Sequence, residues 1–226
     1  MKPSKAYIIR ISSELSRRYA KDAANSCEKI GLSYEFVEGM ENKTAYDAWA
    51  QCGLSVKTLG VYKTTKIDKA ACATVSHAKV WDMISKRKET AIVLEHDAIM
   101  LHPVNVDIPD NLLVTLGYKL ADPRKYNHTA AGEPRDISLI DGHEGAHAYA
   151  LNWKTAEVML SELNSIGVSL PIDNTFFLKM RKTKIPLGIM NPTPAIGWIR
   201  ESTIWSHSSE INYPFFDSFS KNYRTS

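Results

Sequence analysis

The apolar run at residues 90–94 ends abruptly in two carboxylates, Glu95 and Asp97. Ile92 and Val93 favour β-structure, so the run predicts a buried strand. In open α/β sheets, ligands bind at the carboxyl ends of the strands. Side chains two residues apart on an extended chain point the same way, so both carboxylates are expected to face one site. Such a pair could hold one hard divalent cation, Mn²⁺ or Mg²⁺, against a diphosphate.

His96 stands between the two carboxylates, and alternation predicts that it points to the opposite face of the strand. Two interpretations of His96 are open. It is either a neutral bystander or an added nitrogen ligand that changes the preferred metal. The geometric argument favours the bystander. For the tripeptide as a whole, the simple alternative is a solvated strand end that binds nothing.

A competing motif is formed by His143, Glu144 and His147, which match the zinc metallopeptidase pattern His-Glu-x-x-His. That chemistry needs both histidines on one helical face, with the glutamate as general base. Glycines before and within the motif each disfavour a helix by roughly 1 kcal/mol relative to alanine. The residues at 148–152 are typical of a strand followed by a helix cap. A zinc metallopeptidase is therefore the alternative function, on a motif that we expect to be accidental.

The elements that must position these residues alternate between strands and helices. Strands are expected at 6–11, 33–37, 90–94, 112–116, 146–151 and 185–190, and helices at 13–30, 43–52, 69–86, 154–166 and 171–182. Asn152 is an expected helix cap and Gly31 an expected helix stop. The alternation predicts an α/β fold with a mostly parallel, doubly wound sheet. Irregular structure is expected at 57–66, 121–141 and 191–226.

The composition excludes several classes of protein. The chain has 226 residues, 44% of them hydrophobic and 23% charged, which fits one globular domain over residues 1–226. A net charge of +3 is too small to indicate nucleic-acid binding. No segment approaches the ~20 apolar residues that span a bilayer. Cys27, Cys52 and Cys72 are expected to be reduced thiols, so a cytoplasmic location is expected. The oligomeric state is left open.

The helix at 69–81 and the strand at 91–98 together resemble glycosyltransferase family 25, which includes lipooligosaccharide and collagen galactosyltransferases. The family pattern is a small-residue helix with a Ser-His pair, here Ser76 and His77, and then a strand ending Leu-Glu-Asp-Asp-Ala. Weaker similarity follows in order at 7–18, 145–151 and 171–173. One departure is His96, where the family usually has aspartate, and this departure bears on the metal preference.

The resemblance implies a single Rossmann-like domain of the GT-A type that binds a nucleotide sugar at the carboxyl edge of its sheet. It implies transfer of a hexose, most often galactose, from a UDP-sugar to a hydroxyl of a glycan or other acceptor. The family inverts the anomeric centre. Mn²⁺ or Mg²⁺ at Glu95 and Asp97 would stabilise the departing diphosphate. The alternative within this class is a catalytically degenerate protein that binds nucleotide sugars.

The resemblance also implies roles for further residues. Asp173 is the expected base that deprotonates the acceptor, with Asp141 as its rival. The donor pocket is expected to include Ile11, Arg18, Ser76 and His77. His77 is expected either to bond the nucleotide sugar or to fix the acidic strand, and a packed core histidine is the alternative. The segment at 191–226 is expected to be a tail or to face the acceptor.

Overall fold

The computed structural model describes residues 1–44, 47–48, 50, 67–119, 133–140, 146–166, 172 and 185–197. In these ranges the elements are, in chain order, β1 (Lys5–Arg10), α1 (Glu14–Lys29), β2 (Ser33–Glu38), α3 (Ile67–Arg87), β3 (Thr90–Glu95), β4 (Ala98–Met100), β5 (Leu113–Thr115), β6 (Gly117–Lys119), β7 (Asp136–Ile140), β8 (Ala148–Asn152), α4 (Trp153–Ile166), β9 (Leu187–Asn191) and β10 (Ala195–Gly197). The loop expected at 57–66 and most of the helix expected at 171–182 lie outside the described residues.

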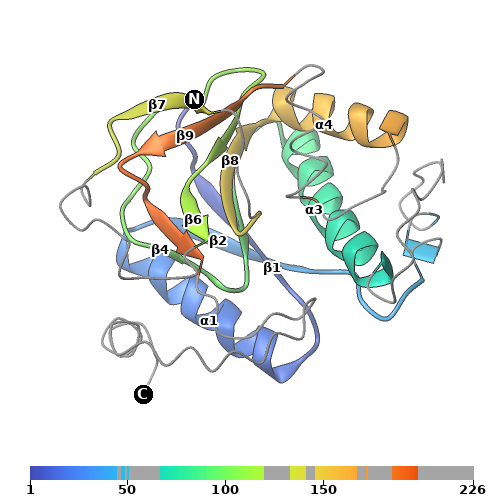
Figure 1. The fold of residues 1–226 in the computed structure, drawn as a ribbon. Coiled ribbons are helices and arrows are strands. Elements are labelled where there is room, and N and C mark those ends of the chain that lie inside the picture. The colour runs from blue at the N-terminus through green and yellow to red at the C-terminus, as the bar shows by residue number, and fades with distance from the viewer. Residues whose placement is uncertain are drawn as a thin grey trace.

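A seven-stranded sheet in the order β2-β1-β3-β8-β5-β9-β7 forms the centre of the molecule (Figure 1). β1 is parallel to β2 and β3, and β5 is parallel to β9. β8 runs antiparallel to both β3 and β5, and β7 runs antiparallel to β9. Five strands therefore share one direction, which confirms the expected α/β fold with a mostly parallel sheet. Their carboxyl ends lie at one edge, where β8 begins.

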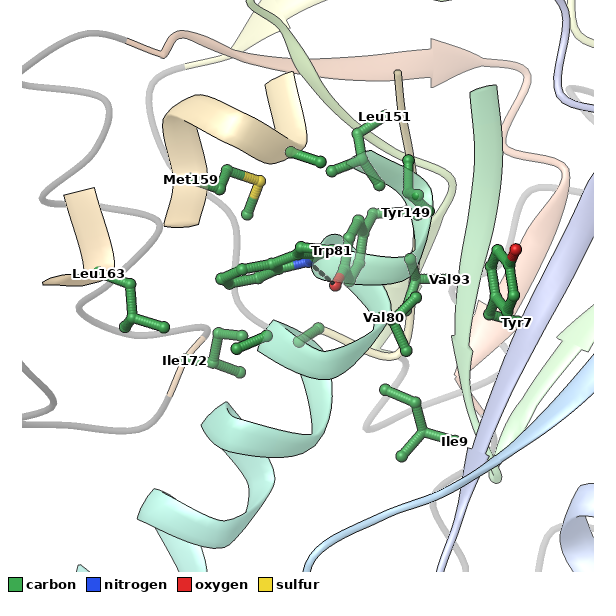
Figure 2. Packing of buried hydrophobic residues seen from close by; sticks show 14 of the residues in the cluster. Tyr7, Ile9, Val80, Trp81, Val93, Tyr149, Leu151, Met159, Leu163 and Ile172 are labelled. Atoms are coloured by element: carbon green, nitrogen blue, oxygen red, sulfur yellow. Dashed lines mark hydrogen bonds between the residues drawn. The ribbon is translucent and has the colours of Figure 1, made fainter. Parts of the chain in front are cut away.

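Helices cover both faces of this sheet (Figure 1). The strict alternation of strand side chains sends Ile8 and Ile92 toward α1, and Tyr7, Val93 and Tyr149 toward α3 and α4. Figure 2 shows the second face, where Trp81 of α3 lies between Tyr149 and the α4 side chains. The central strands are buried on both faces, which explains their almost continuous apolar sequence.

Side chains cap the starts of α1 and α4, and the cap of α4 was expected from the sequence. Ser13 accepts a hydrogen bond from the Ser16 amide at 3.2 Å and begins α1, which ends before Gly31 at φ +70°. Asn152 accepts one from the Thr155 amide at 2.9 Å and begins α4. No helix in the described part of the chain is long and apolar enough to cross a membrane. Cys27 and Cys72 carry free, buried thiols.

Four short strands were not expected from the sequence. β4, β10 and β6 form a second, three-stranded sheet in that order, with β10 antiparallel to β4 and parallel to β6. β7 is an edge strand inside the segment expected to be irregular at 121–141, and β10 lies inside the one at 191–226. Both expectations were wrong at these strands, because three-residue strands and an exposed edge strand carry too little hydrophobic alternation to be recognised.

Candidate functional site

The acidic segment lies where the central sheet passes into the second sheet. β3 ends at Glu95, and His96 and Asp97 form a turn that leads directly into β4. Glu95 is the register partner of Ile9 at the end of β1, so it lies at the carboxyl edge. The extended chain expected through Asp97 therefore stops two residues early, because the chain has to leave the sheet to pair with β10. Asp97 is half-buried in this turn.

Glu95 is held by a histidine of the preceding helix. Its Oε1 atom lies 3.1 Å from Nε2 of His77 on α3. The Glu95 amide donates to the His147 carbonyl at 2.8 Å, which fixes the backbone at the end of the strand. His77 is buried, whereas the Glu95 side chain is 30% exposed. The pair therefore joins the protein interior to an open sheet edge.

The second ring nitrogen of His77 is bonded to the core. Nδ1 of His77 lies 2.8 Å from the Tyr149 hydroxyl on β8. The Trp81 indole N–H donates to that same hydroxyl at 2.8 Å, as the dashed line in Figure 2 shows. All three of these side chains are buried. A chain of hydrogen bonds therefore runs from Trp81 through Tyr149 and His77 to the carboxylate of Glu95.

The electrostatics around this chain of hydrogen bonds favour an ionised Glu95. Burial by itself raises the pKa of the carboxyl group, but the hydrogen bond and charge of His77, with the charges of His96 and His147, outweigh it and lower the pKa to about 2. Burial, together with the charge of Glu95, raises the pKa of Tyr149 well above its usual range despite the Trp81 bond. At neutral pH the phenol therefore keeps its proton and the carboxylate only accepts hydrogen bonds.

His96 packs on the other side of the sheet. Its ring is parallel to that of Tyr19 on α1, with an interplanar angle of 7° and centroids 6.2 Å apart. The expectation that His96 points away from Glu95 is confirmed, since Glu95 faces α3. This packing supports the interpretation of His96 as a bystander. The Arg18 guanidinium lies 5.3 Å from the centroid of the same Tyr19 ring and is exposed.

Ser76 holds the loop that follows β2. Its hydroxyl donates to the Cys72 carbonyl at 2.7 Å and accepts from the Met40 amide at 2.8 Å, and the side chain is buried. A Cβ atom on Gly39 would lie only 3.0 Å from the Ser76 Oγ atom. The expected donor-pocket residue Ser76 is therefore placed next to the edge, with its hydrogen-bonding capacity used to position a loop.

Ile11 follows β1 at the same edge. Its amide donates to the Ser16 hydroxyl at 3.0 Å, and Ser16 is itself buried at the start of α1. The structure thus brings Ile11, Ser76, His77 and Glu95 to one edge of the sheet. Asp173 and its rival Asp141 lie outside the described residues, so their roles as bases stay predictions.

His147 is a residue whose structural role the sequence reasoning missed. It lies in a bend before β8 and is buried between two glycines of the second sheet. A Cβ atom on Gly197 would lie 2.8 Å from His147 Cγ, and one on Gly117 would lie 3.1 Å from Nε2. No single motif signals this packing, because the glycines are distant from His147 in sequence.

The zinc motif is not supported by the part of it that is described. His143 and Glu144 lie outside the described residues, but His147 occupies a bend and the chain continues directly into β8. In the described residues His147 is therefore not part of a helix, whereas a zinc metallopeptidase requires both histidines on one helical face. The expectation that the match is accidental agrees with this conformation.

The donor chemistry at the edge fits a hard divalent cation that also binds substrate oxygens. Within the described ranges, no group of three or more His, Cys, Asp or Glu side chains could hold a metal ion. The ionised Glu95 and the nearby Asp97 offer oxygen ligands, and Mg²⁺-type ions are commonly held by one or two carboxylates together with phosphates. The residues suit such a shared site rather than a closed protein cage.

The chain is thus an α/β protein with a mostly parallel sheet and an acidic segment at the carboxyl edge of that sheet. In sequence, residues 3–108 match the family described as glycosyltransferase family 25 (LPS biosynthesis protein). This match covers β1 to β4 and agrees with the resemblance drawn from the sequence. No curated protein matches the chain in sequence.

Solved glycosyltransferases have a similar fold. The structure of an active-site mutant of LgtC is 10% identical, with a TM-score of 0.50, and the match covers 96% of this chain and 95% of that one. The galactosyltransferase LgtC with donor and acceptor sugar analogs gives 11% identity and a TM-score of 0.46 over 89% and 92% of the two chains. The apo-form glycosyltransferase GlyE of Streptococcus pneumoniae TIGR4 gives 11% and 0.44 over 83% of this chain, which spans only 45% of GlyE. At these identities the similarity concerns the fold alone.

Proposed function

We propose that the protein is a metal-dependent, inverting glycosyltransferase that moves a hexose, galactose in the first instance, from a UDP-sugar to a hydroxyl of a glycan or other acceptor. The observation that carries the proposal is the ionised Glu95 at the carboxyl edge of β3. This edge is where open α/β sheets bind their ligands. The family 25 match over residues 3–108 supports the class of reaction.

In the proposed reaction, a bond forms between the acceptor oxygen and the anomeric carbon while the bond from that carbon to the diphosphate breaks. The hydroxyl proton passes to a carboxylate base, for which Asp173 is our candidate. Arg18, which is exposed and lies near the Tyr19 ring on which His96 is stacked, is our candidate for contacting the donor phosphates. Ile11 and Ser76 would shape the edge through the loops that they hold.

Glu95 and Asp97 would hold Mn²⁺ or Mg²⁺. When bound, such an ion would stabilise the negative charge that develops on the departing UDP. The low pKa of Glu95 keeps this ligand ionised throughout the physiological pH range, so no proton has to be displaced before the cation binds. A cytoplasmic location, consistent with the free thiols of Cys27 and Cys72, is part of the proposal.

The test is release of UDP from a panel of UDP-hexoses in the presence of Mn²⁺, Mg²⁺ or EDTA. We expect turnover that EDTA abolishes, and loss of that turnover in Asp97→Asn and Glu95→Gln. The matched control is Asp110→Asn, since Asp110 is a carboxylate bonded to Asn152 and Lys154 at the opposite edge of the sheet. Full activity in Asp97→Asn would contradict the assignment. UDP-sugar binding without any release of UDP would instead favour the degenerate, binding-only alternative.

A further inference from the structure

We propose that Tyr149 is a positioning residue of this site: its hydroxyl fixes the tautomer of His77, and His77 in that tautomer orients the Glu95 carboxylate. The inference rests on the proposed function in one respect, which is that Glu95 is the carboxylate that serves the ligand. Tyr149 and Trp81 are both buried, and their hydrogen bonds lead to Glu95 through His77, so both would act through His77.

The tautomer follows from counting donors and acceptors along the chain. The Trp81 indole can only donate, so it occupies an acceptor position of the Tyr149 oxygen. The ionised Glu95 carboxylate can only accept, so in a neutral His77 the ring proton resides on Nε2 and points at Oε1, 3.1 Å away. Nδ1 is then the acceptor nitrogen, and the Tyr149 hydroxyl donates to it at 2.8 Å. The reverse tautomer would place a lone pair opposite the carboxylate.

The position of His77 explains how it can act on the site without contacting the nucleotide-sugar donor. The side chain is only 1% exposed, and both of its ring nitrogens are bonded within the protein. Of the two roles expected for His77, the geometry therefore supports fixing the acidic strand. Its bond occupies one carboxylate oxygen, while the Glu95 side chain keeps 30% of its surface exposed. His77 can thus orient the Glu95 carboxylate from the protein interior, and the exposed part of the carboxylate can still bind a ligand.

The tyrosine anchor is also held rigidly. Tyr149 pairs with Val93 in the register of β8 and β3, two residues before Glu95, and packs in the core with Trp81 and Leu151 (Figure 2). Its ring is stacked on that of His77, with centroids 5.7 Å apart and an interplanar angle of 25°. Packing and hydrogen bonds both hold Tyr149 in place, so its hydroxyl has a fixed position relative to His77.

The test compares two tyrosines that differ in where their hydroxyls point. Tyr149→Phe removes the hydroxyl that joins Trp81 and His77 in the chain of hydrogen bonds. The control is Tyr7→Phe, because Tyr7 is equally buried, pairs with the same Val93 from β1, and bonds Glu89 and Arg87 at the amino edge of the sheet. We measure Mn²⁺ binding by electron paramagnetic resonance, and kcat and KM for UDP-galactose by UDP release. Thermal unfolding of each variant is recorded alongside.

We expect Tyr149→Phe to weaken Mn²⁺ binding or lower kcat by about 10- to 100-fold, the usual effect of losing a hydrogen bond that orients a metal ligand. KM for UDP-galactose should change little, because an orienting defect acts on the reacting complex. Tyr7→Phe should retain Mn²⁺ binding and kcat even if its thermal stability falls as far. Equal behaviour of the two variants would overturn the proposal.

A second pair of variants separates the two bonds of His77. His77→Gln can still extend an amide N–H toward Glu95, whereas His77→Asn is one carbon shorter and keeps only the reach to Tyr149. We expect Gln to restore more activity than Asn. This pair tests the bond from His77 to Glu95, and equal loss in both variants would refute the positioning role of His77. If Tyr149→Phe fails to fold, the tautomer of His77 in the wild type decides the role of Tyr149.

The tautomer itself is read by ¹⁵N NMR of the His77 side chain in the full chain at pH 8. We expect the Nε2–H form in the wild type and a mixed population in Tyr149→Phe. An Nδ1–H wild type, or a spectrum unchanged by Tyr149→Phe, would overturn the inference whether or not the protein is an enzyme. Conversely, absence of both Mn²⁺ binding and UDP release in the wild type, with the expected tautomer, would refute the proposed function and leave the hydrogen-bonded chain intact.

Discussion

The contribution of the ionised Glu95 side chain to the unfolding free energy gives the sharpest test of the site's electrostatics. A carboxyl group whose pKa falls from 4.5 in the unfolded chain to about 2 in the folded protein stabilises the folded state by about 3 kcal/mol at neutral pH. Because the folded pKa is the lower one, this stabilisation is fully present above about pH 5. It is lost as the pH falls toward 2, when the folded carboxylate also takes up a proton.

The perturbation is Glu95→Gln, which keeps the shape of the side chain and removes its titration. We expect the difference in unfolding free energy between wild type and Glu95→Gln to shrink by about 3 kcal/mol between pH 5 and pH 2. The assay is urea unfolding followed by circular dichroism, with EDTA present so that no cation contributes. Taking the difference at each pH cancels the acid sensitivity of the groups that do not interact with Glu95. A difference that stays constant with pH would refute the reasoning, since His77 would then give the carboxylate no advantage.

Three further predictions concern the structure around the site. Asn152→Ala should lower the unfolding free energy by about 1 kcal/mol or more in urea titrations, because the Thr155 amide loses its cap; Asn152→Asp should not restore the stability, because its carboxylate would face that of Asp110. Gly197→Ala should cost about 1–3 kcal/mol in the same measurement, since its Cβ would lie 2.8 Å from the His147 ring; no loss would contradict the described packing. Burial raises the pKa of Cys27 to about 12, so iodoacetamide at pH 8 should leave it unmodified until urea unfolds the chain, as peptide mass spectrometry would show.

Much of the fold could be predicted because local chemistry and tertiary structure agree in it. The apolar run of β3 is buried on both faces, so a simple stretch of β-favouring residues was a sufficient signal. Asn152 and Ser13 cap their helices as their residue types indicate. The direction of β8 was not predictable in this way, since nothing in its own sequence specifies antiparallel pairing with β3.

The candidate site was predicted only as far as the strand extends. Glu95 lies where period-two alternation places it, but the turn at His96 and Asp97 is imposed by pairing of β4 with β10, far along the chain. His77 was singled out by its similarity to a family pattern, whereas its partner Tyr149 could be linked to it only through the register of β3 and β8. Contacts of this kind depend on distant segments, and a single sequence carries no local sign of them.

The pairing of β4 with β10 has a consequence for how the protein is made. The acidic turn is synthesised near residue 96, but β8 at Ala148–Asn152 and β10 at Ala195–Gly197, which flank it in the folded protein, leave the ribosome much later. Contacts between such distant segments form slowly, because the long intervening loop must first be closed. During translation, Glu95 and its turn therefore exist for a time without their eventual neighbours. Assembly of this sheet edge is accordingly among the last steps in the synthesis and folding of the protein.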